Sequence, residues 1–207
     1  MFICTHLNDE YSKYSIPIRY IYIKMNKEKI ILGIDPGTNI MGYGLIKKSN
    51  TKIRFLFLDV VLLNKIENHH SKLKKVFKKT AEIINNFSPD EVAIEAPFFS
   101  KNAQSMLKLG RAQGAAITAA IMQNIPVTEY APKKIKLAIT GRGQASKEQV
   151  AGMLINMLAI KKVPKYLDAT DGLAAAVCHA LQNKVSNVQK KGTWTQFVKQ
   201  NPNRVQK

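Results

Sequence analysis

Residues 31–46, ILGIDPGTNIMGYGLI, decide the fold of this 207-residue chain. The apolar run that opens the segment ends at Asp35, immediately before the turn-forming pair Pro36-Gly37. Apolar character returns at residues 42–46 (GYGLI), as expected for a second strand that folds back on the first. The segment therefore predicts a buried strand whose last residue is a carboxylate.

Segments with the spacing of strands and of helices alternate along the rest of the chain. Further strands are expected over residues 53–63, 91–95 and 126–130, and helices over residues 69–87, 102–123, 131–139, 146–158 and 168–182. Ser146 is the expected N-cap of its helix. This order predicts an α/β fold in which a mixed five-stranded sheet has helices on both faces.

The chain is expected to hold one domain between two flanking segments. Residues 29–183 form the domain, and residues 1–28 precede it as an extension that is either non-native or disordered, since Met25 is an alternative start. Residues 184–207 contain six Lys or Arg and no acid, so they form a basic tail. Two interpretations of Trp194 in this tail remain open: it docks on the domain, or the tail reaches DNA.

The composition favours a polyanionic partner. The net charge is +18, which points to nucleic acid or to an anionic membrane surface. No apolar stretch is long enough to span a bilayer, and residues 1–24 lack the apolar core of a secretory signal. The two cysteines, Cys4 and Cys178, indicate neither a disulfide framework nor a zinc site. A protein of the cytoplasm is the simplest expectation.

Four carboxylates stand where a metal site is expected. Asp35 and Glu95 each end a strand, and Asp168 and Asp171 stand three residues apart at the start of a helix, so that both face the same way. Because clustered acids repel one another, they need compensation, and oxygen ligands favour Mg²⁺ or Mn²⁺ over zinc. Two such ions can activate a water molecule and stabilise the leaving oxygen during hydrolysis of a phosphodiester.

Each acid also has an ordinary structural interpretation. Asp35 is a common turn residue before Pro-Gly, and Glu95 is compatible with a solvated strand end. Asp168 and Asp171 suit the first turn of a helix, where a negative charge is favourable. Residue spacing alone leaves the metal site and these ordinary roles about equally supported.

Longer motifs decide between the two interpretations, because the chain resembles the RuvC family across residues 29–183. The matching motifs are GIDPGT (33–38), GYG (42–44), VAIE (92–95), FFSKNAQSMLKLGRAQG (98–114), EYAPKKIK (129–136), TGRGQASKEQV (140–150) and DATDGLAAAVCHA (168–180). The resemblance implies a ribonuclease-H-like fold and a homodimeric, Mg²⁺-dependent Holliday junction resolvase. Such enzymes nick two strands of like polarity symmetrically in a four-way DNA junction, in recombination and repair, and leave ligatable ends.

The resemblance also implies roles for individual residues. Asp35, Glu95, Asp168 and Asp171 fall on the family's catalytic, metal-binding acids, which hold two Mg²⁺ ions per subunit, with Mn²⁺ as a substitute. Phe98 falls on an aromatic residue that stacks at the junction centre, and Lys136 and Lys147 fall on basic positions near the scissile phosphate. The remaining DNA-contact candidates lie on or before the long helix, which is also the expected dimer surface: Lys101, Asn102, Lys108 and Arg111. A RuvA–RuvB branch-migration complex is a further partner implied by the family, and no membrane is.

Two residues on the last helix need separate interpretation. Gly172 stands where family members commonly have Ala, and is expected to loosen the helix by up to roughly 1 kcal/mol. His179 is interpreted as a packing or surface histidine rather than a ligand.

Three rival functions share part of the pattern. An actin-like ATPase or sugar kinase also has D-x-G-T after a strand, but it needs a second phosphate loop that this chain lacks. A junction-binding protein without catalysis would not need four acids. A ribonuclease H or a YqgF-like resolvase is disfavoured by the KNAQSMLKLG match.

Overall fold

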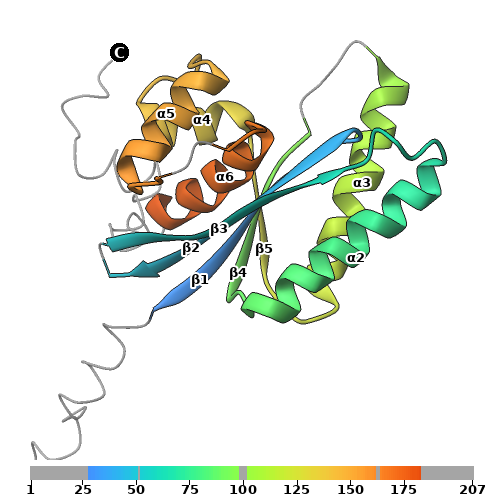
Figure 1. Cartoon of the computed structure of the whole chain (residues 1–207), viewed down its shortest axis with the longest axis horizontal. Helices are drawn as coiled ribbons and strands as arrows, with labels where there is room; N and C mark the ends of the chain where they lie inside the picture. The colour runs from blue at the N-terminus through green and yellow to red at the C-terminus, as the bar shows by residue number, and fades with distance from the viewer. Residues whose placement is uncertain (1–27, 51, 98–101, 162–163, 183–207) are drawn as a thin grey trace, which may run out of the picture.

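A five-stranded mixed sheet forms the centre of the molecule. The computed structural model describes residues 28–50, 52–97, 102–161 and 164–182. The strand order is β3-β2-β1-β4-β5, with antiparallel β1–β2 and β2–β3 pairs and parallel β1–β4 and β4–β5 pairs (Figure 1). The strands are β1 (Lys29–Asp35), β2 (Ile40–Ser49), β3 (Lys52–Leu62), β4 (Glu91–Glu95) and β5 (Val127–Tyr130). The predicted hairpin and mixed sheet are therefore confirmed.

Helices cover both faces of this sheet, as predicted. They are α2 (His69–Phe87), α3 (Ala103–Ile121), α4 (Pro132–Thr140), α5 (Lys147–Met157) and α6 (Asp168–Gln182). Helices α2 and α3 lie on one face, and α4, α5 and α6 lie on the other (Figure 1). Ser146 caps α5, as expected. Within the described part of the chain, no helix combines the length and the apolar character needed to cross a membrane.

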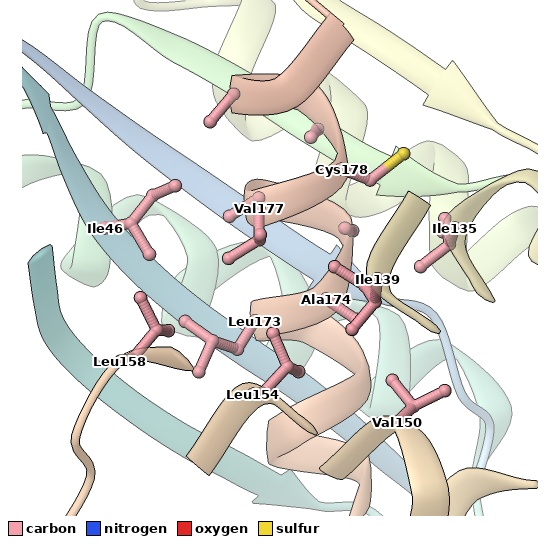
Figure 2. Close-up of a cluster of buried hydrophobic side chains, with 14 of the residues drawn as sticks. Ile46, Ile135, Ile139, Val150, Leu154, Leu158, Leu173, Ala174, Val177 and Cys178 are labelled. Atoms are coloured by element: carbon pink, nitrogen blue, oxygen red, sulfur yellow. The ribbon is translucent and has the colours of Figure 1, made fainter. Parts of the chain in front are cut away.

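The side chains of β1 point alternately into two hydrophobic cores, and this alternation sets the side of the sheet on which Asp35 lies. Leu32 and Ile34 are fully buried in the core that includes α2 and α3. Ile31 belongs to the other core, which is built around Leu173 and Val177 of α6 and side chains of α4 and α5 (Figure 2). Because successive side chains of a strand point to opposite faces, Asp35 faces the same side as Ile31, toward α6.

Glycines let α6 lie directly on β1 and β2. A Cβ atom at Gly42 would fall 1.7 Å from the carbonyl oxygen of Asp168, and one at Gly44 would fall 2.4 Å from the Cα atom of Leu173. Gly172 faces the same contact from the helix, since a Cβ there would lie 2.8 Å from the carbonyl oxygen of Gly42. Gly172 therefore has a packing role that its low helix propensity did not suggest.

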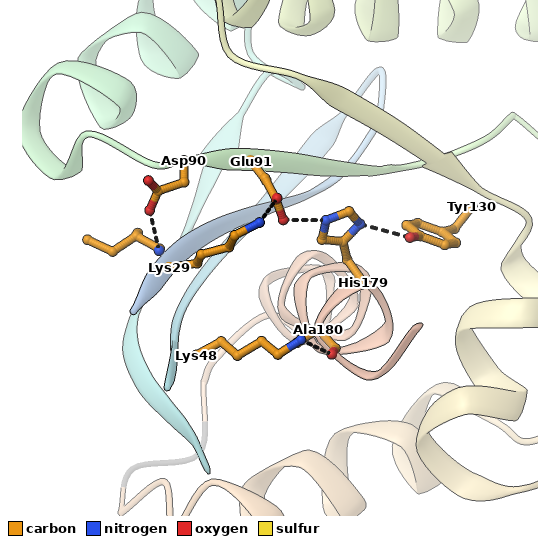
Figure 3. A network of polar contacts seen from close by, with 8 residues as sticks. Lys29, Lys48, Asp90, Glu91, Tyr130, His179 and Ala180 are labelled. Atoms are coloured by element: carbon orange, nitrogen blue, oxygen red, sulfur yellow. Dashed lines mark hydrogen bonds and ion pairs between the residues drawn. The ribbon is translucent and has the colours of Figure 1, made fainter. Parts of the chain in front are cut away.

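A chain of polar contacts fixes the other end of α6 (Figure 3). His179 is buried; its Nε2 atom lies 2.8 Å from Oε2 of Glu91, and its Nδ1 atom lies 2.8 Å from the hydroxyl of Tyr130. Lys29 donates to the other oxygen of Glu91, and Nζ of Lys48 donates to the carbonyl oxygen of Ala180 at 2.7 Å. The interpretation of His179 as a packing residue is confirmed.

Candidate active site

Three carboxylates meet where β1 ends and α6 begins. Asp35, Asp168 and Asp171 each offer one carboxylate oxygen, and these three oxygen atoms lie within 4.8 Å of one another. The two α6 residues are three positions apart and so share one face of the helix. They reach Asp35 because Gly42, which is paired with Asp35 across the β1–β2 ladder, lets the first turn of α6 touch the sheet.

Glu95 stands beside this group. Strands β1 and β4 are parallel and pair Ile34 with Ile94, so Asp35 and Glu95 follow at the same edge of the sheet. Ala93 belongs to the core that includes α6, and strand alternation therefore places Glu95 on the α6 face as well. Its carboxylate is adjacent to the three-acid group but is not one of the members that share the 4.8 Å limit.

Burial and neighbouring negative charges raise the pKa values of three of these acids. Burial, followed by the neighbouring charges of Glu95 and Asp171, raises the pKa of Asp35 well above its usual range. Burial, followed by the charge of Asp171, raises the pKa of Glu95 to about 7. Burial also raises the pKa of Asp171. A divalent cation would remove this repulsion, and a donor set made only of carboxylate oxygens suits a hard ion such as Mg²⁺ or Mn²⁺.

Lys147 supplies a positive charge in direct contact with two of these acids. Its Nζ atom lies 2.6 Å from Oδ2 of Asp171 and 3.8 Å from Oδ1 of Asp168. A reciprocal cap fixes its position, because Ser146 and Gln149 each accept a hydrogen bond from the other's backbone N–H group. Burial opposes the charge of Lys147, yet its hydrogen bond to Asp171 raises its pKa.

Lys136 of α4 lies near enough for its charge to offset part of the rise in the pKa values of Glu95 and Asp171. Of the two predicted phosphate-site lysines, Lys147 therefore contacts the carboxylates, and Lys136 lies in their neighbourhood. A lysine at the first position of a helix is unfavourable to the helix dipole, so the acids compensate Lys147 in turn.

The other predicted DNA contacts lie away from the acids or outside the described residues. Phe98 and Lys101 fall outside them. Asn102 caps α3 by accepting a hydrogen bond from the backbone N–H of Ser105 at 3.0 Å. Lys108 and Arg111 are exposed on α3.

The sequence interpretation did not place Lys108 and Arg111 of α3 near His69 of α2. The pKa of His69 is lowered by burial and then by Arg111. Positive charges of α3 therefore lie near the start of α2, a relationship that no single motif encodes.

The fold and the site together define a class. A mixed sheet with acids at the ends of adjacent parallel strands and on the last described helix is the arrangement of ribonuclease-H-like nucleases. The family model for the crossover junction endodeoxyribonuclease RuvC matches residues 31–179, and the chain belongs to this family. It is thus a structure-specific endodeoxyribonuclease.

Relatives and solved structures agree with this assignment. The chain is 58% identical over 182 residues to RuvC of Christiangramia forsetii, covering 87% of this chain and 95% of that protein. It is 56% identical to RuvC of Bacteroides fragilis, covering 86% and 97%.

Among solved structures, Thermus thermophilus RuvC in complex with a Holliday junction substrate superposes with a TM-score of 0.71 at 32% identity, covering 76% of this chain and 96% of that one. The yeast mitochondrial Holliday junction resolvase Ydc2, at 15% identity and a TM-score of 0.57, covers 82% of this chain and 83% of its own and shares the fold.

Proposed function

We propose that this chain resolves Holliday junctions by nicking two strands of like polarity symmetrically, in homologous recombination and DNA repair, to leave ligatable duplexes. The observation that carries the proposal is the convergence of Asp35, Asp168 and Asp171 beside Glu95 in a chain of net charge +18. Since the proposed substrate is a recombination intermediate of chromosomal DNA, the proposed location is the cytoplasm.

The proposed cofactor is Mg²⁺, with two ions per subunit and Mn²⁺ as a substitute. Asp35, Glu95, Asp168 and Asp171 are the residues that would hold the ions. Divalent ions bound by carboxylates activate water and stabilise the leaving oxygen of a phosphodiester. Glu95 must be ionised to hold a cation, and its pKa of about 7 puts this ionisation near neutral pH.

The two aspartates of α6 are proposed to contribute unequally. Asp171 has a side chain only 13% exposed and is the closer partner of Lys147, whereas the side chain of Asp168 is 32% exposed. Once Asp171 is otherwise compensated, Lys147 is free to turn toward a phosphate, with Lys136 on the same side of the acids. The pair of lysines would then hold the scissile phosphate against the carboxylates.

The proposal also covers DNA contacts beyond the carboxylates and two protein partners. Phe98, Lys101, Asn102, Lys108 and Arg111 are the proposed contacts to the junction, with Phe98 stacking on bases at its centre. A homodimer is proposed to form through α3, whose Leu107 is 62% exposed and whose Gly110 and Gly114 have open space at the Cβ position. The RuvA–RuvB complex is the proposed branch-migration partner.

Domain boundaries are part of the same proposal: residues 29–183 form the nuclease domain, flanked by an extension (1–28) and a basic tail (184–207).

Cleavage of a synthetic four-way junction tests the proposal. The purified protein with Mg²⁺ should cut the junction and leave a linear duplex and an RNA–DNA hybrid largely intact. Asp35→Asn should abolish cutting while the variant still binds the junction. Asp90→Asn, at an exposed acid before β4, is the matched control and should cut normally. Cleavage by Asp35→Asn at the wild-type rate, or ATP hydrolysis independent of DNA, would refute the proposal.

A further inference from the structure

An apolar groove lies between β3 and the connection from α5 to α6. Its volume is about 760 Å³, and its lining is mostly apolar. Phe55, Leu56 and Phe57 line it from β3, and Ile160, Pro164 and Tyr166 line it from the connection. The volume falls within the range of roughly 300–1,000 Å³ that is typical of sites enclosing small organic groups. The groove is therefore large enough to hold bulky side chains.

The strand that borders the groove is an edge strand. β3 pairs with β2 on one side, and no other described strand pairs with its outer side. The register shifts beside the groove, because Ile46 pairs with Phe55 and Leu45 pairs with Phe57. Leu56 is thus an extra residue of a bulge, and it is 38% exposed. An apolar edge of this kind invites a further chain segment unless something covers it.

One segment of this chain has the chemistry to cover it. Residues 192–198, GTWTQFV, carry no charge, although Lys190, Lys191 and Lys199 flank them. Their Thr, Trp, Phe and Val residues favour extended structure. Lys161 and Lys165 line the groove and would repel the flanking lysines. The groove therefore suits the uncharged segment better than it suits the rest of the basic tail.

The segment is close enough along the chain to reach the groove. Lys48 of β2 holds Ala180 near the end of α6, and Lys48 pairs with Ile53 of β3, two residues before Phe55. The eleven residues from 183 to 193 span at most about 40 Å, whereas the 15 residues of α6 extend roughly 22 Å. Eleven residues are thus enough to return along the whole length of α6.

We propose that residues 192–198 dock in cis in this groove as an added strand beside β3, with the Trp194 ring inserted among Phe55, Phe57 and Tyr166. A Trp and a Phe side chain each bury about 150–250 Å² when enclosed. The short connection makes docking intramolecular, at an effective concentration in the millimolar range. Since Ala169 also lines the groove, the docked segment rests against the first turn of α6, next to Asp168.

Fluorescence of the full chain tests this directly, because Trp194 is the only tryptophan of the protein. In the absence of DNA, its emission should lie at shorter wavelength than that of a peptide of residues 188–207, with several-fold weaker quenching by acrylamide. Leu56→Lys should shift the emission to that of the peptide. Leu62→Lys is the matched control, since Leu62 lies on the same strand at 36% exposure and does not line the groove.

A second variant changes a residue of the tail and leaves the residues of the folded domain unchanged. Phe197→Lys should expose Trp194 as Leu56→Lys does, with unchanged circular dichroism.

The proposal is overturned if Trp194 of the wild-type protein emits like Trp194 of the peptide. Protection from acrylamide that appears only with a junction assigns the tail to DNA instead. Protection that is lost on dilution to nanomolar protein assigns the groove to a second copy. Protection that survives Leu56→Lys places the docking elsewhere. Each readout is independent of junction cleavage, so failure of the proposed resolvase activity leaves this test intact.

Discussion

Nζ of Lys147 lies 2.6 Å from Oδ2 of Asp171, so the first residue of α5 is bonded to the first turn of α6. The contact joins a cation proposed to meet the scissile phosphate with an acid proposed to hold a metal ion. Both side chains are positioned by helix starts, one capped by Ser146 and the other packed on Gly42. The charge balance of the site therefore depends on how these two helices begin.

Removing this cation should slow cleavage. Lys147→Met leaves the phosphate without one of its two proposed lysine partners, so we expect kcat on a four-way junction to fall by about 10²-fold, the typical effect of losing one donor to a developing negative charge. Single-turnover cleavage at saturating Mg²⁺ measures it. Lys52→Met, at the exposed start of β3, should leave kcat unchanged. A Lys147→Met variant as fast as the wild type would remove Lys147 from the proposed mechanism.

The buried carboxylate of Glu95 should make stability depend on pH. Its pKa rises from 4.5 to about 7 on folding, so between these values the folded state binds more protons than the unfolded state. The free energy of unfolding therefore falls as pH rises through this window, by roughly 3.5 kcal/mol at about 1.4 kcal/mol per pKa unit. Glu95→Gln removes this cost, and without metal it should be more stable than the wild type at pH 8 but not at pH 4.5.

Urea unfolding in EDTA at the two pH values measures the effect. Glu67→Gln, at an exposed residue before α2, is the control and should show no such difference. Added Mg²⁺ should stabilise the wild type at pH 8 more than it stabilises Glu95→Gln, because binding to the folded state alone raises stability. Equal stability of Glu95→Gln and wild type at pH 8 would contradict the proposed burial of charge.

The contact between Gly42 and α6 should tolerate no side chain. Gly42→Ala places a methyl group against the carbonyl oxygen of Asp168, so the first turn of α6 must move away from Asp35. We expect a loss of about 3 kcal/mol or more of stability and no detectable cleavage. Gly152→Ala on α5, where a Cβ meets nothing within 4 Å, should instead stabilise by about 0.5–1 kcal/mol. Thermal unfolding of both variants decides the matter, and a cleavage-competent Gly42→Ala would show that the contact is dispensable.

The Tyr130–His179–Glu91 chain should support stability rather than chemistry. An ionised Glu91 only accepts hydrogen bonds, so Nε2 of His179 donates to it, and Nδ1 of His179 pairs with the Tyr130 hydroxyl. Tyr130→Phe leaves Nδ1 buried without its partner, which should cost about 1–3 kcal/mol in urea unfolding. Junction cleavage by the folded variant should stay at the wild-type rate.

Tyr166→Phe, outside this chain of contacts, serves as the control, with an expected change below about 0.5 kcal/mol. A loss of cleavage that exceeds the loss of folded protein would show that the hydrogen-bonded chain acts on the site itself.

Local patterns were sufficient for the elements and for the positions of the four acids at their ends, whereas the role of the acids rested on the longer family motifs. Ile31, Leu32 and Ile34 form a buried run that is visible in the sequence, and the turn at Pro36-Gly37 ends it at Asp35. The alternation along β1 also sets the face of Asp35, so its direction toward a helix follows from period two alone. Boundaries differ by one or two residues at helix ends, as at the starts of α3 and α5, which the side chains of Asn102 and Ser146 cap.

Contacts between distant segments were not accessible in the same way. Taken one at a time, Gly42 is a glycine in a strand and Gly172 is a glycine expected to loosen a helix. Only the packed structure shows that the two face each other. The hydrogen bonds of His179 depend on β4 and β5, and the groove depends on an edge strand meeting a connection far along the chain. No periodicity encodes such pairings, because they arise from the topology of the sheet.

The placement of two of the acids on α6 has a consequence for biosynthesis. Asp35 leaves the ribosome early, whereas Asp168 and Asp171 are made near the end of the domain, and they meet Asp35 only when α6 docks on β1 and β2. A nascent or interrupted chain that lacks α6 therefore carries at most Asp35 and Glu95 and has no complete cutting centre. A protein that breaks DNA thus acquires this ability only on completion of the fold that also restricts what it cuts.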